Sequence, residues 1–224
     1  MIELDHVVFF SKQSPEEHVR NNKGTSIGGR HKSWGTVNAL TYTKNSYIEY
    51  LSVEQMDIAK QANHPLTKLL LHDLENGEGW GTICFRTENI EALNRRLKKE
   101  GWTTSGVLNA ERETSTGFIR KWRMLFIEQT VSDELPLPFF IEWNESFEER
   151  MQNLREDGTL KDYNEQLQIS RCEFLVKHPR NQVEKWGSLL GIEPSDDTII
   201  LVNTDLVFLK GTQEKERLSH LEIN

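Results

Sequence analysis

Two short stretches of the chain repeat one pattern: an aromatic residue, isoleucine, glutamate and a second aromatic residue. They are Tyr-Ile-Glu-Tyr at 47–50 and Phe-Ile-Glu-Trp at 140–143, and each lies in an apolar run typical of a β-strand. A carboxylate inside a buried strand is costly unless it is ion-paired, hydrogen-bonded or bound to a metal. The repetition of this unfavourable feature predicts a functional site built from two related halves, with Glu49 and Glu142 as its acidic members.

A histidine in the first predicted strand, residues 3–10, could join the two glutamates. Alternate side chains of a strand share one face, so His6 is expected on the same face as Leu4. Imidazole and carboxylate groups suit Zn, Mn, Fe, Ni or Co. His6, Glu49 and Glu142 are therefore predicted to bind a divalent transition metal, although one glutamate could instead act as a base. The alternative is that the glutamates are half-exposed and paired with Arg or Lys, while His6 is a hydrogen-bonded core residue.

A glycine-containing segment at 28–38 places four further polar or aromatic side chains close together. We predict it to be a loop that orients a ligand, because glycine allows the chain to approach closely. Arg30 could bind an anionic group and His31 could transfer a proton, while Trp34 and Asn38 would contact the substrate. The alternative interpretation is a solvated turn.

The predicted strand at 118–128 supplies a second group of candidate substrate-binding residues. Arg120 and Trp122 lie on one face by alternation, and Arg120 could hold a carboxylate or phosphate. Trp122 and Trp143 could form aromatic walls of a cleft. The alternative is a ladder of charged residues on an outer face. Four other histidines are predicted to be surface residues: His64, His72, His178 and His220.

The composition narrows the class of protein. The chain has 224 residues and a formal net charge of −8, with no long basic run, which argues against a general nucleic-acid binder. No apolar stretch approaches the length of about 18 residues that a membrane-spanning helix needs. The first residues show no signal-peptide pattern, and Cys84 and Cys172 form no CxxC motif, so we expect buried free thiols and a cytoplasmic location.

The pattern of a strand, a helical segment and further strands occurs three times, beginning near residues 4, 80 and 169. The most regular helix follows the second start, with Asn89 as its N-cap and Gly101 as its stop. The predicted divisions of the chain are a two-module domain at 1–145, a polar helical linker at 146–167, a third partial βαββ module at 168–210 and a polar tail at 211–224.

The sequence resembles the vicinal oxygen chelate superfamily, and within it the glyoxalase-like proteins of the glyoxalase/dioxygenase group. The resemblance is carried by Leu-Asp-His-Val-Val at 4–8, Gly-Gly-Arg-His at 28–31, Gly-Thr-Val-Asn-Ala-Leu at 35–40, Tyr-Ile-Glu-Tyr-Leu at 47–51 and Pro-Leu-Pro-Phe-Phe-Ile-Glu-Trp at 136–143. It covers residues 1–145 well and residues 168–210 weakly.

The resemblance implies an α+β fold of paired βαβββ modules whose sheets curl around a cleft, with a third, degenerate module. Metal enzymes of this superfamily take ligands from the first and last strands of two modules, which corresponds here to His6, Glu49 and Glu142. The fourth ligand position falls on Thr82, which is a poor ligand for a transition metal. The modules could pair within one chain or between the two chains of a homodimer.

The leading functional hypothesis is a metal-dependent lyase, isomerase or dioxygenase that acts on a small oxygenated molecule and stabilises an enolate or oxyanion. Glu49 and His31 are its predicted catalytic residues. The second hypothesis is a non-catalytic protein that binds or sequesters a small molecule between aromatic walls. A metal-free cleft in which Glu49 and Glu142 share a hydrogen bond would favour it. The third is a structural protein that has kept the fold and lost the site.

Overall fold

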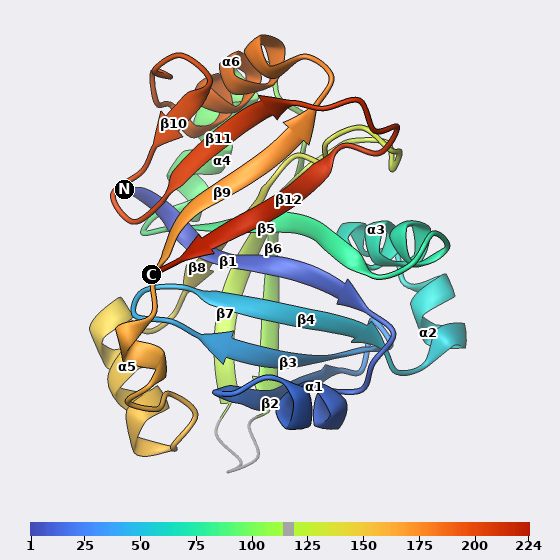
Figure 1. Ribbon diagram of the computed structural model, residues 1–224, viewed down its shortest axis with the longest axis vertical. Helices are drawn as coiled ribbons and strands as arrows, with labels where there is room; N and C mark the ends of the chain where they lie inside the picture. The colour runs from blue at the N-terminus through green and yellow to red at the C-terminus, as the bar shows by residue number, and fades with distance from the viewer. Residues whose placement is uncertain (114–118) are drawn as a thin grey trace.

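The described residues, 1–113 and 119–224 of a computed structural model, fold into two β-sheets flanked by helices (Figure 1). The strands are β1 (Ile2–Ser11), β2 (Thr25–His31), β3 (Thr36–Tyr42), β4 (Tyr47–Val53), β5 (Gly79–Thr87), β6 (Thr104–Glu113), β7 (Ile119–Ile127), β8 (Phe139–Trp143), β9 (Ile169–Val176), β10 (Thr198–Ile200), β11 (Asp205–Lys210) and β12 (Arg217–Ile223). The helices are α1 (Pro15–Asn21), α2 (Met56–Gln61), α3 (Pro65–Leu74), α4 (Ile90–Lys99), α5 (Phe147–Glu156), η1 (Asn164–Gln166) and α6 (Pro179–Leu190).

Two βαβββ modules form the large sheet, whose strand order is β2-β3-β4-β1-β5-β8-β7-β6. Each module pairs its first strand with its last in parallel, β1 with β4 and β5 with β8. The modules meet through the antiparallel pairing of β1 with β5. The predicted α+β fold is confirmed, and these two modules pair within one chain.

The third module repeats part of this topology in a sheet of order β10-β11-β9-β12. Strand β9 pairs with β11 in parallel and with β12 in antiparallel fashion, as β1 does with β4 and β5. In Figure 1 this sheet lies across the top of the molecule, above the large sheet. Within the segment predicted as a polar tail at 211–224, residues 217–223 form β12, which pairs with β9.

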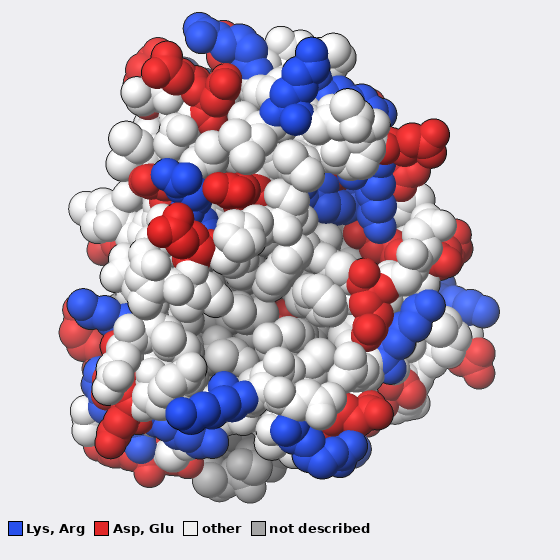
Figure 2. Space-filling view, in the orientation of Figure 1, with Lys and Arg blue, Asp and Glu red and all other residues white. Residues whose placement is uncertain are grey.

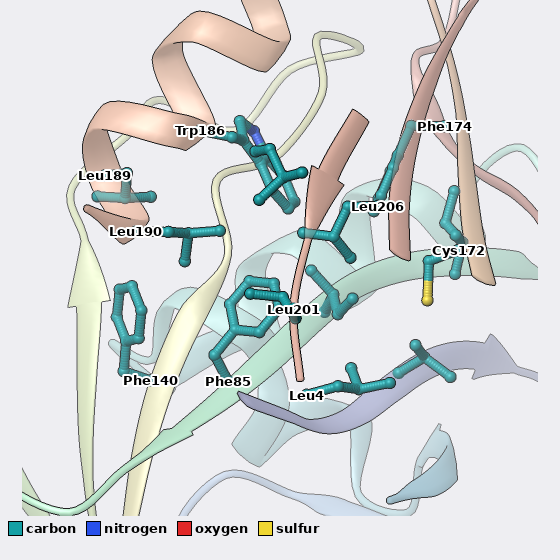
Figure 3. Packing of buried hydrophobic residues seen from close by; sticks show 14 of the residues in the cluster. Leu4, Phe85, Phe140, Cys172, Phe174, Trp186, Leu189, Leu190, Leu201 and Leu206 are labelled. Carbon is teal, nitrogen blue, oxygen red and sulfur yellow. The ribbon is translucent and has the colours of Figure 1, made fainter. Parts of the chain in front are cut away.

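One hydrophobic cluster joins the third module to the convex face of the large sheet. Figure 3 shows Trp186 and Leu190 of α6 above Phe85 and Phe140, which project from β5 and β8. Trp186 has no exposed surface and contacts the ring of Phe85 edge-on at a centroid distance of 6.2 Å. This shared core is the reason that the third module packs on its own chain.

The concave face of the large sheet is closed at both ends by helices. Leu66 and Leu70 of α3 pack into a cluster with Phe10 and Phe139 at one end. Residues of α5 pack against β3 and β4 at the other, and Figure 1 shows α5 and α3 on opposite sides of the sheet. Burial of these apolar faces leaves little free space inside the curl of the sheet.

Two edge strands, β2 and β6, were not predicted from the sequence. Strands β2 and β6 form the outer edges of the large sheet, and β2 includes residues 28–31 of the segment predicted as a loop. Edge strands carry polar residues and lack the regular apolar alternation of central strands. Strand β7 lies within the predicted strand at 118–128, of which residue 118 lies outside the described residues.

Charge is mixed on the face shown in Figure 2, where acidic and basic side chains are interspersed around an uncharged centre. None of the described helices is both long and apolar enough to cross a membrane.

Candidate functional site

The site begins at an irregularity in β1. The pairing of β1 with β5 shifts register between Leu4 and His6, which marks a β-bulge. Leu4 therefore packs in the convex core, although strict alternation placed it on the same face as His6. Asp5 and His6 are both buried, with 1 % and 3 % of their surfaces exposed, and the Nδ1 atom of His6 lies 2.8 Å from Asp5 Oδ1.

Glu49 on the neighbouring strand completes a line of three groups. The parallel register places Val8 opposite Glu49, so the carboxylate lies on the concave face near His6. Its Oε2 atom is 3.5 Å from His6 Nε2, and only 6 % of the residue is exposed. Asp5, His6 and Glu49 thus form a buried row of contacting groups in the order carboxylate, imidazole, carboxylate.

Asn38 of β3 holds the other oxygen of Glu49. Its side-chain amide donates to Glu49 Oε1 at 2.5 Å and accepts from the backbone N–H of Gly29 at 2.7 Å. A Cβ atom at Gly28 would lie 2.0 Å from the Asn38 side-chain oxygen, so no larger residue fits there. Gly28 therefore leaves room for Asn38, and the backbone N–H of Gly29 holds the Asn38 amide that binds the Glu49 carboxylate.

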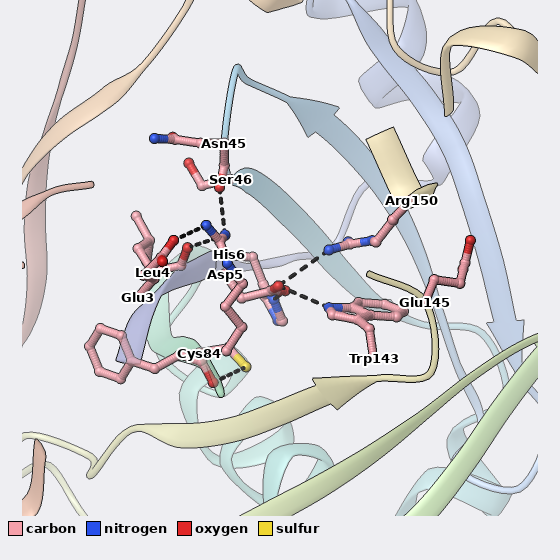
Figure 4. A network of polar contacts seen from close by, with 12 residues as sticks. Glu3, Leu4, Asp5, His6, Asn45, Ser46, Cys84, Trp143, Glu145 and Arg150 are labelled. Carbon is pink, nitrogen blue, oxygen red and sulfur yellow. Dashed lines mark hydrogen bonds and ion pairs between the residues drawn. The ribbon is translucent and has the colours of Figure 1, made fainter. Parts of the chain in front are cut away.

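Arg150 and Trp143 hold Asp5 from the other side. Figure 4 shows the Asp5 carboxylate between them; Trp143 donates to Asp5 Oδ2 at 2.9 Å and Arg150 Nη1 lies at 3.3 Å. A capping box between Ser146 and Glu149 starts α5 and so places Arg150 in its second turn. Burial alone would raise the pKa of Asp5, but Arg150 and His6 together outweigh it and hold that pKa well below its ordinary value. Asp5 is thus ionised and accepts the Nδ1 proton of His6.

A cavity of about 50 Å³ lies on the concave face next to Glu49. Glu49, His6, Asn38 and Tyr47 line it, and the other lining residues are His31, Trp34, Thr36, Leu40, Tyr42, Leu51, His64, Leu66, Thr67, Trp122, Met124, Phe139, Ile141 and Trp143. The cavity shares His31, Trp34 and Trp122 with an open groove of about 1540 Å³. The cavity and the groove therefore adjoin at these three side chains.

Two of the candidates at 28–38, Arg30 and His31, lie in different surroundings. Arg30 is an exposed side chain paired with Glu54 at 2.7 Å, and it does not line the cavity. His31 does line it; its Nδ1 lies 3.0 Å from Thr36 Oγ1, and its ring is 5.0 Å from that of Trp34. His31 thus lines both the cavity and the open groove, Arg30 lines the groove alone, and a ligand contact at either residue stays a prediction.

Of the candidate substrate-binding residues on β7 and β8, Trp122 and Trp143 line the cavity and Arg120 does not. Arg120 is 4 % exposed and pairs with Glu145 at 2.9 Å and Asp157 at 3.5 Å, away from the cavity lining. Its predicted contact with a substrate carboxylate is therefore not supported by its position. Trp122 and Trp143 line the cavity, with ring centroids 5.5 Å apart, as aromatic walls would.

Glu142 lies on the opposite face of the sheet from Glu49. Phe139, Ile141 and Trp143 face the concave side, and Glu142 accepts from the backbone N–H of Ile90 at 2.6 Å and pairs with Arg123. The prediction that Glu142 meets His6 and Glu49 is therefore wrong. A difference of one residue in register turns every side chain of a strand to the other face, and the two similar sequence stretches differ in this way.

The described residues do not fit the predicted divalent metal. Their only group of three His, Cys, Asp or Glu donor atoms lying within 4.8 Å of one another is Asp5, His6 and Cys84. Asp5 is already bonded to Arg150, and burial raises the pKa of the Cys84 thiol well above its ordinary value, which disfavours the thiolate that a metal needs. His6 and Glu49 supply two donors, whereas zinc sites in proteins use three or four.

The structure adds three site residues that the sequence analysis did not predict, namely His64, Asp5 and Arg150. His64, predicted at the surface, is 5 % exposed and stacks on Trp34 at 4.0 Å. It is the N-cap residue of α3, followed by Pro65, a signal that indicates a helix start and not a site. The adjacent Asp5 and His6 could have indicated a histidine ring held by a neighbouring carboxylate. No motif in the sequence around Arg150 indicates a contact with Asp5.

Paired βαβββ modules around a concave site define a protein of the vicinal oxygen chelate type, and this resemblance is confirmed. The profile of a family described as "Glyoxalase-like domain" matches residues 4–190. The chain therefore belongs to the glyoxalase-like family.

Three solved structures illustrate the similarity. A hypothetical protein from Staphylococcus aureus is 25 % identical with a TM-score of 0.85, and the match covers 100 % of this chain and 91 % of that one. A hypothetical protein from Bacillus halodurans C-125 is 18 % identical with a TM-score of 0.44, covering 65 % and 96 %. A Streptomyces coelicolor methylmalonyl-CoA epimerase variant is 19 % identical with a TM-score of 0.43, covering 63 % and 97 %. Comparison with curated proteins finds no match.

Proposed function

We propose that this protein is an acid–base enzyme that moves a proton on a small oxygenated molecule bound in the concave cavity. Glu49 is the group that exchanges the proton with the substrate. The observation that carries the proposal is the buried chain of Asp5, His6 and Glu49, with contacts of 2.8 and 3.5 Å between successive groups.

The contacts of His6 indicate how a proton could move between His6 and Glu49. Asp5 accepts the Nδ1 proton, so a neutral imidazole has a lone pair at Nε2. That nitrogen lies 3.5 Å from Glu49 Oε2, so a proton can pass between the two groups. With the proton on His6, Glu49 is a carboxylate base; with the proton on Glu49, it is an acid.

The surroundings suit a base that must keep one orientation. Asn38 fixes one oxygen of Glu49, and Arg150 balances the charge of Asp5, so protonated His6 remains paired on both sides. Positioned acids and bases of this kind contribute about 100- to 10,000-fold to reaction rates. The resulting reaction class is proton removal next to a carbonyl or similar group, as in isomerisation or elimination.

The test is solvent exchange. A panel of small oxygenated compounds is incubated with the protein in D₂O, and NMR follows the replacement of carbon-bound hydrogen by deuterium. Glu49→Gln should lower the exchange rate at least about 100-fold. The matched control is Glu142→Gln, because Glu142 has the same local sequence context but lies on the convex face. Equal exchange by the wild type and Glu49→Gln would contradict the proposal.

A second candidate function is binding without catalysis, and the aromatic walls favour it. Trp34, Trp122 and Trp143 are among the residues that line the cavity, and an aromatic lining suits retention of a small ligand. Saturable binding of a panel compound with no deuterium exchange would support this function over the enzyme.

A further inference from the structure

His64 lines the cavity beside Glu49 and carries a buried ring nitrogen that makes no hydrogen bond within the described part of the chain. Its ring is buried, lines the cavity, stacks on Trp34 and meets Phe126 edge-on at 5.1 Å. Its Nε2 atom has no hydrogen-bond partner among the residues that the structure describes. A buried polar atom without a partner costs free energy, so its presence in a cavity points to a ligand that supplies the missing bond.

The contact of the other ring nitrogen allows Nε2 to be a hydrogen-bond donor, and we assign this tautomer as part of the proposal below. The other ring nitrogen, Nδ1, faces the Thr67 hydroxyl at 3.5 Å, and a hydroxyl can rotate to donate to it. The proton of the neutral imidazole then lies on Nε2. Burial lowers the pKa of His64 to about 4, so the ring is neutral near neutral pH and offers one N–H group. The complementary ligand atom is therefore an acceptor oxygen.

The charge and size of the cavity limit which ligands could supply that acceptor oxygen. Of the described residues, no Lys or Arg lines the cavity, whereas Glu49 does. An anionic ligand would meet the Glu49 carboxylate, and protonated His6 is already paired with Asp5 and Glu49, so an uncharged ligand is favoured. A volume of about 50 Å³ has room for roughly four water-sized groups, since one water needs about 10–15 Å³ on this measure.

We propose that His64 Nε2–H binds the carbonyl oxygen of a small, uncharged ketone or aldehyde whose neighbouring C–H is exchanged by Glu49. This inference rests on the proposed function and adds its substrate class. The C–H proton passes to the Glu49 carboxylate, and the C–H electron pair forms the C=C bond of an enolate. The carbonyl π pair moves onto oxygen, where the bond from His64 stabilises the developing charge. Return of a proton from Glu49 reverses the step, and no oxidant or reductant is required.

The experiment uses hydroxyacetone, an uncharged ketone with acidic C–H groups, and pyruvate, a ketone of similar size that is an anion. Side-chain ¹⁵N–¹H spectra in H₂O report the His64 Nε2–H signal during titration, and deuterium exchange is measured on parallel samples in D₂O. Wild-type protein should show a shift of that signal and exchange with hydroxyacetone, and neither with pyruvate. His64→Phe keeps an aromatic ring against Trp34 and should weaken hydroxyacetone binding at least about 10-fold, as expected for one lost hydrogen bond.

The matched control is His72→Phe, which changes a half-exposed histidine of the same helix outside the cavity lining. It should bind and exchange hydroxyacetone as the wild type does. No response of the His64 signal to hydroxyacetone, up to the roughly 100 mM needed for ligands of a few atoms, overturns the proposal. Equal binding of pyruvate also overturns the assignment of an uncharged substrate.

The outcomes separate this inference from the function on which it rests. If hydroxyacetone shifts the His64 signal but is not exchanged, proton transfer by Glu49 fails and the oxygen-binding role of His64 stands. If exchange depends on Glu49 but is unchanged in His64→Phe, the enzyme stands and the role of His64 is refuted.

Discussion

Burial of His64 should make the protein lose stability in mild acid. Its pKa falls from the ordinary 6.5 to about 4 because burial disfavours the charged ring. Below pH 6.5 the unfolded chain takes up a proton here that the folded protein refuses until about pH 4. Protonation therefore favours the unfolded state, and stability that is fully present above pH 6.5 falls as the pH falls towards 4.

The interval from 6.5 to about 4 sets the size of the effect. One pH unit across such an interval is worth about 1.4 kcal/mol, so His64 should account for a loss of about 3 kcal/mol in the free energy of unfolding. His64→Phe removes the titrating group and keeps a ring next to Trp34. The variant should therefore gain about 3 kcal/mol relative to the wild type on going from pH 7 to pH 4, whatever its stability at pH 7.

Urea denaturation of both proteins at several pH values between 4 and 7 measures this difference. His18, whose pKa burial also lowers, and Asp5, whose pKa lies below its ordinary value, are present in both proteins, so their effects cancel. A difference between wild type and variant that stays constant with pH would refute the reasoning. It would mean that the folded protein accepts a proton on His64 as readily as the unfolded chain does.

Three further predictions concern the rest of the site. Arg150→Met should cost about 3–5 kcal/mol in urea denaturation, because it leaves the buried Asp5 carboxylate without its cation; Arg180→Met, at an exposed ion pair, should leave the midpoint unchanged, and equal effects would contradict this. Glu142→Gln should cost about 1 kcal/mol in the same assay, because the carboxylate binds the N-terminal N–H of α4, and no loss of stability would argue against that contact. Added Zn, Mn, Fe, Ni or Co should leave the melting temperature unchanged, since a site with a Kd 100-fold below the metal concentration would add about 2.7 kcal/mol. A rise of several degrees that His6→Ala abolishes would show that the donor-set argument is wrong.

Much of the fold could be predicted from local patterns. The central strands β1, β4 and β8 are apolar runs of strand length, and α4 shows its cap, its apolar spacing and its stop in the sequence. Asn89 does cap α4 by accepting from the N–H of Ala92. These features depend on residues a few positions apart, which is why sequence alone reveals them. The edge strands β2 and β6 and the terminal β12 depend on pairing partners elsewhere in the chain.

The face on which a side chain lies was predicted less well than the strand that carries it. Glu49 and Glu142 have nearly the same neighbours, yet one faces the cavity and the other caps a helix on the opposite side of the sheet. The bulge at Leu4 and His6 had a similar effect on β1, because it turned Leu4 into the convex core. Register and bulges are set by contacts across the sheet, so a strand pattern alone does not reveal them.

The sequence by itself determined the family, the βαβββ modules and two members of the site, His6 and Glu49. Their types and strand positions are local properties of the chain. Only the tertiary structure decided what surrounds them, because His64 and Arg150 arrive from helices α3 and α5, which close the concave face from opposite ends. A group acquires its protonation state and its ligand from burial and from neighbours brought together by folding, and those neighbours are far apart in the chain.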